Sequence, residues 1–257
     1  MILAGGRGTR ISEETSARPK PMVEIGNRPL LWHIMSIYAR QGHHDFIICL
    51  GYKGYVIKEY FVNYLLHNSD VTFNLASGSV KVHRADAEPW NVTLIDTGVE
   101  TMTGGRVRRA LPFVSDEPAF FMTYGDGLGN IDISSLLAFH RAHGRLATLT
   151  AVQPSPRFGT LQIADGTVTQ FSEKAQATAG WVNGGFFVLS PNISDYLLDD
   201  STVWERGPLE ALANDGQLMA YEHRGFWHPM DTVRDRDYLN ELSAEPVPPW
   251  TVYSSPQ

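Results

Sequence analysis

Residues 1–10 read MILAGGRGTR, an apolar segment that runs directly into a glycine cluster. Residues 1–4 predict the end of a buried strand, and the glycines predict a turn whose backbone can approach a ligand closely. Such a strand and turn are typical of a nucleotide-binding first unit, although an ordinary tight turn explains the glycines equally well. The loop is not a dinucleotide fingerprint, because Ile11 occupies the position of the third glycine, and it lacks the Gly-Lys-Ser/Thr ending of an ATPase P-loop.

Strand and helix patterns alternate downstream of this loop. Apolar residues recur on one helical face over residues 28–42, and residues 53–66 carry a second helix pattern. Apolar runs at residues 45–50 and 118–124 predict buried strands. This alternation predicts an α/β fold with a mainly parallel central sheet that helices cover on both faces.

Two stretches depart from that alternation. Residues 70–96 and 146–189 hold short strand patterns broken by turn residues, which predicts antiparallel insertions around an active-site cleft. We therefore expect a single domain over residues 1–245 with these two insertions. Residues 246–257 contain four prolines and little periodicity, and predict an extended tail that packs on another subunit.

The bulk composition limits the class of protein. With 257 residues, of which 43% are hydrophobic and 19% charged, the chain is long enough to bury a full core. A net charge of -7 argues against binding to a nucleic-acid backbone, which requires a basic surface. The sequence has no 18-residue apolar stretch, no export signal and a single cysteine, Cys49, so we expect no membrane span and a cytoplasmic location.

Two cations near the glycine cluster suit a triphosphate. Binding one requires a backbone that can approach the phosphates and fixed positive charges that offset the charge of the departing pyrophosphate. Arg10 ends the glycine segment, and Lys20 follows in the string Arg18-Pro19-Lys20-Pro21-Met22. We predict that Arg10 and Lys20 supply those charges.

Two aspartates far apart in the chain are candidates for a metal site. Asp126 directly follows the strand predicted at residues 118–124, and Asp231 lies about a hundred residues later. A magnesium ion that bridges triphosphate oxygens takes only one or two protein carboxylates. Gly125-Asp126-Gly127 by itself is more typical of a turn, but ligands of open α/β sheets bind at the carboxyl ends of strands.

The segment from Leu3 to Arg10, together with Lys20-Pro21-Met22, resembles the signature of the nucleotide-sugar pyrophosphorylases. Within that family the sequence is most similar to the branch that uses CTP and glucose 1-phosphate. The similar strings lie at residues 13–26, 96–106, 124–127, 181–187 and 226–232, so the resemblance spans nearly the whole chain. It implies a Rossmann-like, three-layer nucleotidyltransferase fold and a homo-oligomer.

The resemblance also implies roles for individual residues. Arg10 and Lys20 would be catalytic, and Asp126 and Asp231 would hold Mg²⁺. Glu173 and Lys174 would contact the sugar and its phosphate, beside Asn183 and Gly184, although a Glu-Lys pair is more typical of a solvated surface. Nucleotide contacts are implied for Leu3, Ala4, Gly5, Gly6, Gly8, Thr9, Arg10, Lys20, Thr101, Arg106 and Gly125.

The implied reaction transfers a cytidylyl group from CTP to α-D-glucose 1-phosphate, which gives CDP-glucose and pyrophosphate by direct in-line displacement. Uridylyl or thymidylyl transfer remains an alternative, as does a non-catalytic relative that binds nucleotide sugars. Such a relative should lose its cations or its metal carboxylates. This chain retains Arg10, Lys20, Asp126 and Asp231, which favours the enzyme.

Overall fold

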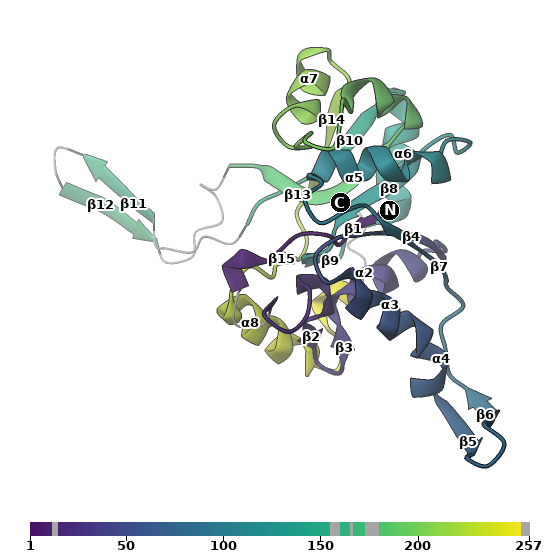
Figure 1. The fold of residues 1–257 in the computed structure, drawn as a ribbon. Helices are drawn as coiled ribbons and strands as arrows, with labels where there is room; N and C mark the ends of the chain where they lie inside the picture. Colours follow the sequence, from purple (N-terminus) through teal and green to yellow (C-terminus); the bar gives the residue numbers. More distant parts are fainter. Residues whose placement is uncertain (12–14, 155–159, 165–166, 173–179, 253–257) are drawn as a thin grey trace.

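The computed structural model describes residues 1–11, 15–154, 160–164, 167–172 and 180–252 (Figure 1). Its centre is a seven-stranded sheet in the order β14-β10-β13-β8-β1-β4-β7. These strands are β1 (Ile2–Leu3), β4 (Asp45–Leu50), β7 (Asn91–Asp96), β8 (Phe120–Tyr124), β10 (Ala147–Val152), β13 (Val182–Leu189) and β14 (Leu218–His223). Only β13 runs antiparallel to its neighbours, so the predicted mainly parallel sheet is confirmed.

Strand β1 is short but lies at the centre of the fold, hydrogen-bonded in parallel to both β4 and β8. Its two residues point to opposite faces, because successive side chains of a strand alternate. Ile2 belongs to one buried apolar cluster and Leu3 to another. The sheet therefore has a packed core on each face, which is the three-layer arrangement that the sequence predicts.

Helices supply the outer layers of both cores (Figure 1). Helices α2 (Leu30–Ala39), α3 (Gly54–Val62), α6 (Ile133–His143) and α8 (Val233–Ser243) contribute buried side chains to the cluster around Ile2. Helices α5 (Thr103–Ala110) and α7 (Pro208–Asn214) contribute to the cluster around Leu3. Among the described residues, no helix combines the length and the apolar character needed to cross a membrane.

The expected insertions at residues 70–96 and 146–189 are too wide. Strand β7 pairs in parallel with β4, and β10 and β13 pair with each other inside the central sheet. Outside it lie two antiparallel hairpins, β5 (Ser69–Asn74) with β6 (Ser79–Ala85), and β11 (Thr160–Ala164) with β12 (Thr167–Ser172). A short strand pattern does not reveal its partner strand, because strand pairing depends on contacts remote in sequence.

Several short elements complete the fold. Two further ladders join β2 (Glu24–Ile25) to β3 (Arg28–Pro29), and β9 (Gly127–Gly129) to β15 (Trp227–Pro229). Helix α4 (Tyr64–His67) follows α3, and 3₁₀ turns lie at η1 (Thr9–Ile11), η2 (Lys20–Met22), η3 (Leu111–Phe113), η5 (Pro191–Tyr196) and η6 (Pro249–Thr251).

The proline-rich tail differs from the extended segment that the sequence predicts. Its described part turns through η6 and buries Trp250, whose side chain is 3% exposed, in the chain's own core. The Trp250 indole donates to His33 Nδ1 at 3.3 Å. The apolar indole determines where this segment packs, because burying a large aromatic side chain is strongly favourable. Residues 253–257 lie outside the described residues.

Candidate active site

A cavity of about 500 Å³ opens beyond the carboxyl ends of β1 and β8. In parallel sheets this edge is where ligands bind, because the strand ends turn outward into loops. Of the residues expected to contact a nucleotide, all but Arg10 line it, namely Leu3, Ala4, Gly5, Gly6, Gly8, Thr9, Lys20, Thr101, Arg106 and Gly125. The side chain of Arg10 lies outside the described residues.

The glycine loop forms one wall of the cavity. Gly8 has φ +62°, and a Cβ there would meet Thr15 Cγ2 at 2.7 Å, so this position requires glycine. A Cβ at Gly5 would lie 2.1 Å from Arg106 Nη1, whereas a Cβ at Gly6 would meet no atom within 4 Å. Gly5 therefore makes room for a neighbouring side chain, and Gly6 leaves room in the cavity.

Arg106 is a buried cation that packs against Gly5 of that wall, with only 4% of its surface exposed. Burial lowers the pKa of its guanidinium, which nevertheless stays protonated because arginine titrates far above neutral pH. Its Nη1 and Nη2 donate to oxygens of three chain segments: Leu50 O, Thr97 Oγ1, Gly98 O, Gly5 O and Val99 O, at 2.7 to 3.3 Å. The side chain therefore ties the glycine loop to the segment after β7.

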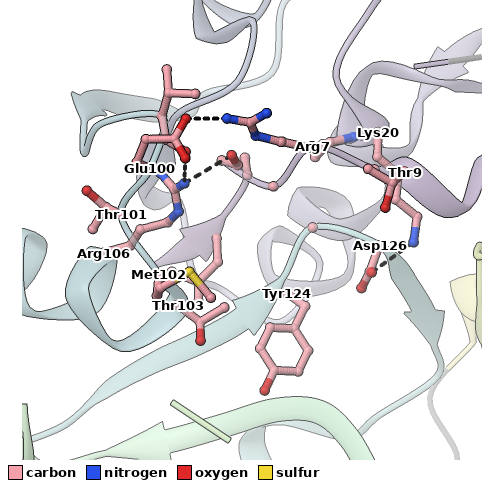
Figure 2. A pocket seen from close by; sticks show the side chains of 18 of the residues that line it. Arg7, Thr9, Lys20, Glu100, Thr101, Met102, Thr103, Arg106, Tyr124 and Asp126 are labelled. Atoms are coloured by element: carbon pink, nitrogen blue, oxygen red, sulfur yellow. Dashed lines mark hydrogen bonds and ion pairs between the residues drawn. The ribbon is translucent and has the colours of Figure 1, made fainter. Parts of the chain in front are cut away.

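Lys20 lies on the opposite side of the cavity, next to Asp126 (Figure 2). Its ammonium donates to Asp126 Oδ2 at 2.9 Å and to Asp231 Oδ1 at 2.8 Å. The lysine side chain is 9% exposed, whereas those of Asp126 and Asp231 are 34% and 16% exposed. The fold thus brings one lysine and both predicted metal carboxylates to one point.

A small ladder explains why the two aspartates meet. Asp126 immediately precedes β9, and Asp231 follows β15, its antiparallel partner. The Met230 amide donates to Asp126 O at 2.7 Å, which extends the ladder to the aspartates. Directly beyond, Thr232 and Asp235 form a capping box at the start of α8, and the Asp231 amide donates to Asp235 Oδ2. Asp231 is therefore held between a ladder and a helix cap.

The donor set at this point suits magnesium. In the part of the chain that the structure describes, no group of three or more histidine, cysteine or acidic residues gathers as a metal cage. Asp126 and Asp231 instead offer two carboxylates that approach one cation from either side. Mg²⁺ is usually held by one or two carboxylates, with substrate phosphates and water completing its octahedron, so the residues present fit it.

Two of the predicted sugar-side residues lie beside Asp126. Asn183 and Gly184 line a recess of about 40 Å³ that also includes Asp126. The Trp227 indole donates to Gly184 O at 2.8 Å and holds this strand end in place. Glu173 and Lys174 lie outside the described residues, so their expected roles stay predictions.

One carboxylate that lines the cavity was not predicted from the sequence. Glu205 lines it, half-buried, and accepts a hydrogen bond of 2.8 Å from Thr103 Oγ1 at the start of α5. Burial, together with the nearby Glu205 carboxylate, raises the pKa of the Tyr124 hydroxyl, so that tyrosine stays neutral. No spacing pattern points to Glu205, because it is 102 residues away from Thr103 in the chain.

The sequence is similar to those of known nucleotidyltransferases. Residues 1–228 match the model of the nucleotidyl transferase family. The chain is 56% identical to the glucose-1-phosphate cytidylyltransferase of Salmonella typhimurium over 98% of both proteins. The chain belongs to the nucleotidyl transferase family. The predicted relationship to enzymes that make nucleotide sugars is thereby confirmed, and the protein is a nucleotidyltransferase.

Solved structures show that this nucleotidyltransferase also has the expected fold. HddC from Yersinia pseudotuberculosis superposes with a TM-score of 0.67 at 23% identity, covering 93% of this chain and 96% of its own. The inositol-1-phosphate CTP transferase from T. maritima superposes with a TM-score of 0.63 at 15% identity, covering 95% of both chains.

Proposed function

We propose that this nucleotidyltransferase transfers the cytidylyl group of CTP to α-D-glucose 1-phosphate and releases pyrophosphate and CDP-glucose. The observation that carries the proposal is the convergence of Lys20, Asp126 and Asp231 at one end of a glycine-lined cavity. The choice of substrates is supported by the 56% identity to the Salmonella typhimurium enzyme over nearly the full length.

The reaction requires no covalent enzyme intermediate. An oxygen of the sugar phosphate forms a bond to the α-phosphorus of CTP, while the bond between that phosphorus and the oxygen bridging to the β-phosphate breaks. Pyrophosphate leaves with the electron pair. A general base is unnecessary because the attacking phosphate is already ionised at neutral pH, so the protein contributes position and charge.

Each group of residues has a proposed task. Backbone groups of the glycine loop bind the triphosphate, and Arg10 and Lys20 offset the charge that develops on pyrophosphate. Asp126 and Asp231 would hold Mg²⁺, which when bound supplies positive charge to the phosphate oxygens. Glu173, Lys174, Asn183 and Gly184 would position the sugar phosphate.

Glu205 extends this assignment. A carboxylate repels phosphate, so in a cavity for a polyanion we expect it to face uncharged hydrogen-bond donors. The nucleoside offers such donors in its ribose hydroxyls and in the amino group of cytosine. Glu205 lines the same cavity as the glycine loop, and it is absent from the recess formed by Asn183 and Gly184, which favours the nucleoside over the sugar.

An assay of pyrophosphate release tests the proposed function. The protein is incubated with glucose 1-phosphate, Mg²⁺ and, in turn, CTP, UTP, dTTP and ATP. We expect the highest kcat/KM with CTP, because a site built to hydrogen-bond one base leaves polar groups unpaired with another. Equal or faster reaction with UTP or dTTP would overturn the cytidylyl assignment, and no release with any nucleotide would favour the non-catalytic relative. The homo-oligomeric state and the cytoplasmic location stay predictions.

A further inference from the structure

The contact between Lys20 and the two aspartates conflicts at first sight with the roles proposed for them. An ammonium that donates to Asp126 and Asp231 at 2.9 and 2.8 Å stands where a metal ion between these carboxylates would stand. Lysine has three donors and no acceptor, so it neutralises carboxylates as a compact cation does. The same lysine is also proposed to meet the phosphates, and it cannot fully occupy both places at once.

The contact is built into the fold. Lys20 belongs to the 3₁₀ turn η2 and its side chain is 9% exposed, so the ammonium has little contact with solvent. The ladder between β9 and β15 holds the two aspartates close together. Two carboxylates at such a position repel each other unless a cation lies between them. The lysine therefore offsets the repulsion between the two carboxylates and keeps them near each other.

We propose that Lys20 is a positioning residue that holds Asp126 and Asp231 together and is displaced from them when a divalent cation binds. This inference rests on the proposed function, since it takes the two aspartates as the metal ligands. Lys20 and the glycine loop line the same cavity, so the displaced ammonium stays close to that loop. Metal binding and phosphate binding are thereby linked through one side chain.

The linkage has a measurable consequence. A cation that must displace Lys20 binds more weakly than it would to the two carboxylates alone, because it gains only the difference between the two sets of contacts. Removal of the ammonium should therefore tighten metal binding when no nucleotide is present. A cation that only served the phosphates, and that lay away from the two carboxylates, would leave that affinity unchanged.

The experiment is a titration of the whole protein with Mn²⁺ in the absence of nucleotide. Binding is measured by electron paramagnetic resonance. We expect Lys20→Met to bind Mn²⁺ about 10-fold more tightly than the wild type. Lys20→Arg keeps the positive charge and should bind weakly, as the wild type does. The matched control is Lys58→Met, which removes the charge of an exposed lysine on α3 and should match the wild type.

Stability provides a second measurement that does not depend on the affinity itself. Lys20→Met removes a cation that both carboxylates contact, so its Tm should fall, and Mn²⁺ should raise that Tm more than it raises the wild-type Tm. Lys20→Gln, which can still donate to both carboxylates, serves the same comparison if the methionine variant does not fold.

The outcomes separate this inference from the proposed function. Unchanged or weaker Mn²⁺ binding by Lys20→Met and Lys20→Gln, with Asp126→Asn also weakened, would overturn the displacement and keep the metal site. Unchanged Mn²⁺ binding by Asp126→Asn and Asp231→Asn would remove the metal site itself, and the inference with it. Tighter binding by the lysine variants together with weaker binding by the aspartate variants would support both.

Discussion

Arg106 and Lys20 are both buried cations of one cavity, but the fold stabilises their positive charges in different ways (Figure 2). Arg106 is surrounded by neutral oxygens, four backbone carbonyls and one hydroxyl, that belong to the framework of the fold. Lys20 is held by two carboxylates that remain partly exposed. Neutral internal acceptors indicate a structural cross-link, whereas charged, accessible partners indicate a contact that can be exchanged for a ligand.

The largest effect on activity is expected at the contact between Lys20 and the two carboxylates. Asp126→Asn keeps an oxygen that can accept from Lys20, so the protein should fold, but it removes one charge from the metal site. Turnover should fall by at least about 100-fold in the pyrophosphate-release assay. Asp132→Asn, at the N-cap of α6, is the matched control, because asparagine caps as well as aspartate. Near-normal magnesium-dependent turnover by Asp126→Asn would remove Asp126 from the site.

Arg106→Met removes the proposed structural cross-link and should destabilise the fold. Five oxygens lose a hydrogen bond. Leu50 O and Gly5 O keep other donors, but weaker bonding of buried acceptors is still costly, so the free energy of unfolding should fall by about 2 to 4 kcal/mol. Urea denaturation of the ligand-free protein measures this. If Arg106→Met kept wild-type stability and lost only nucleotide affinity, Arg106 would be a direct ligand contact, and its contrast with Lys20 would disappear.

The two adjacent glycines sharpen the same contrast. Gly5→Ala places a methyl group against the Arg106 guanidinium and should lower Tm, because the neighbour must shift. Gly6→Ala meets no atom within 4 Å, so its Tm should match the wild type while nucleotide binding weakens. Differential scanning fluorimetry with and without CTP distinguishes them. Equal loss of Tm in both variants would contradict separate roles for the two glycines.

The smallest effect is expected at Glu205. Glu205→Gln keeps an acceptor for Thr103 but weakens a charge-assisted bond to the nucleoside, so the KM for CTP should rise up to about 10-fold. Thr103→Val, which removes the hydrogen bond to Glu205 and the one that Thr103 Oγ1 accepts from the Trp204 amide, is the control. A rise confined to the KM for glucose 1-phosphate would move Glu205 to the sugar side.

The alternation of strands and helices, the glycine loop at the end of β1 and the position of Asp126 after a strand can all be read from the sequence. These features depend on local patterns, namely apolar periodicity and glycine content, that residues close together in the chain reveal. For the same reason, the strands of the expected insertions could be recognised as strands but not assigned to the central sheet.

Which side chains meet depends on the folded structure and not on local sequence. Asp126 and Asp231 lie 106 and 211 residues from Lys20, and Glu205 lies 102 residues from Thr103. Gly5 is 101 residues from the guanidinium that determines why it must be glycine. Contacts of this kind arise from the packing of strands and helices into one sheet and its two outer layers, so no local pattern encodes them. The sequence therefore pointed to Lys20 and to the two aspartates proposed as metal ligands as separate candidates, and the fold brought them into one cluster.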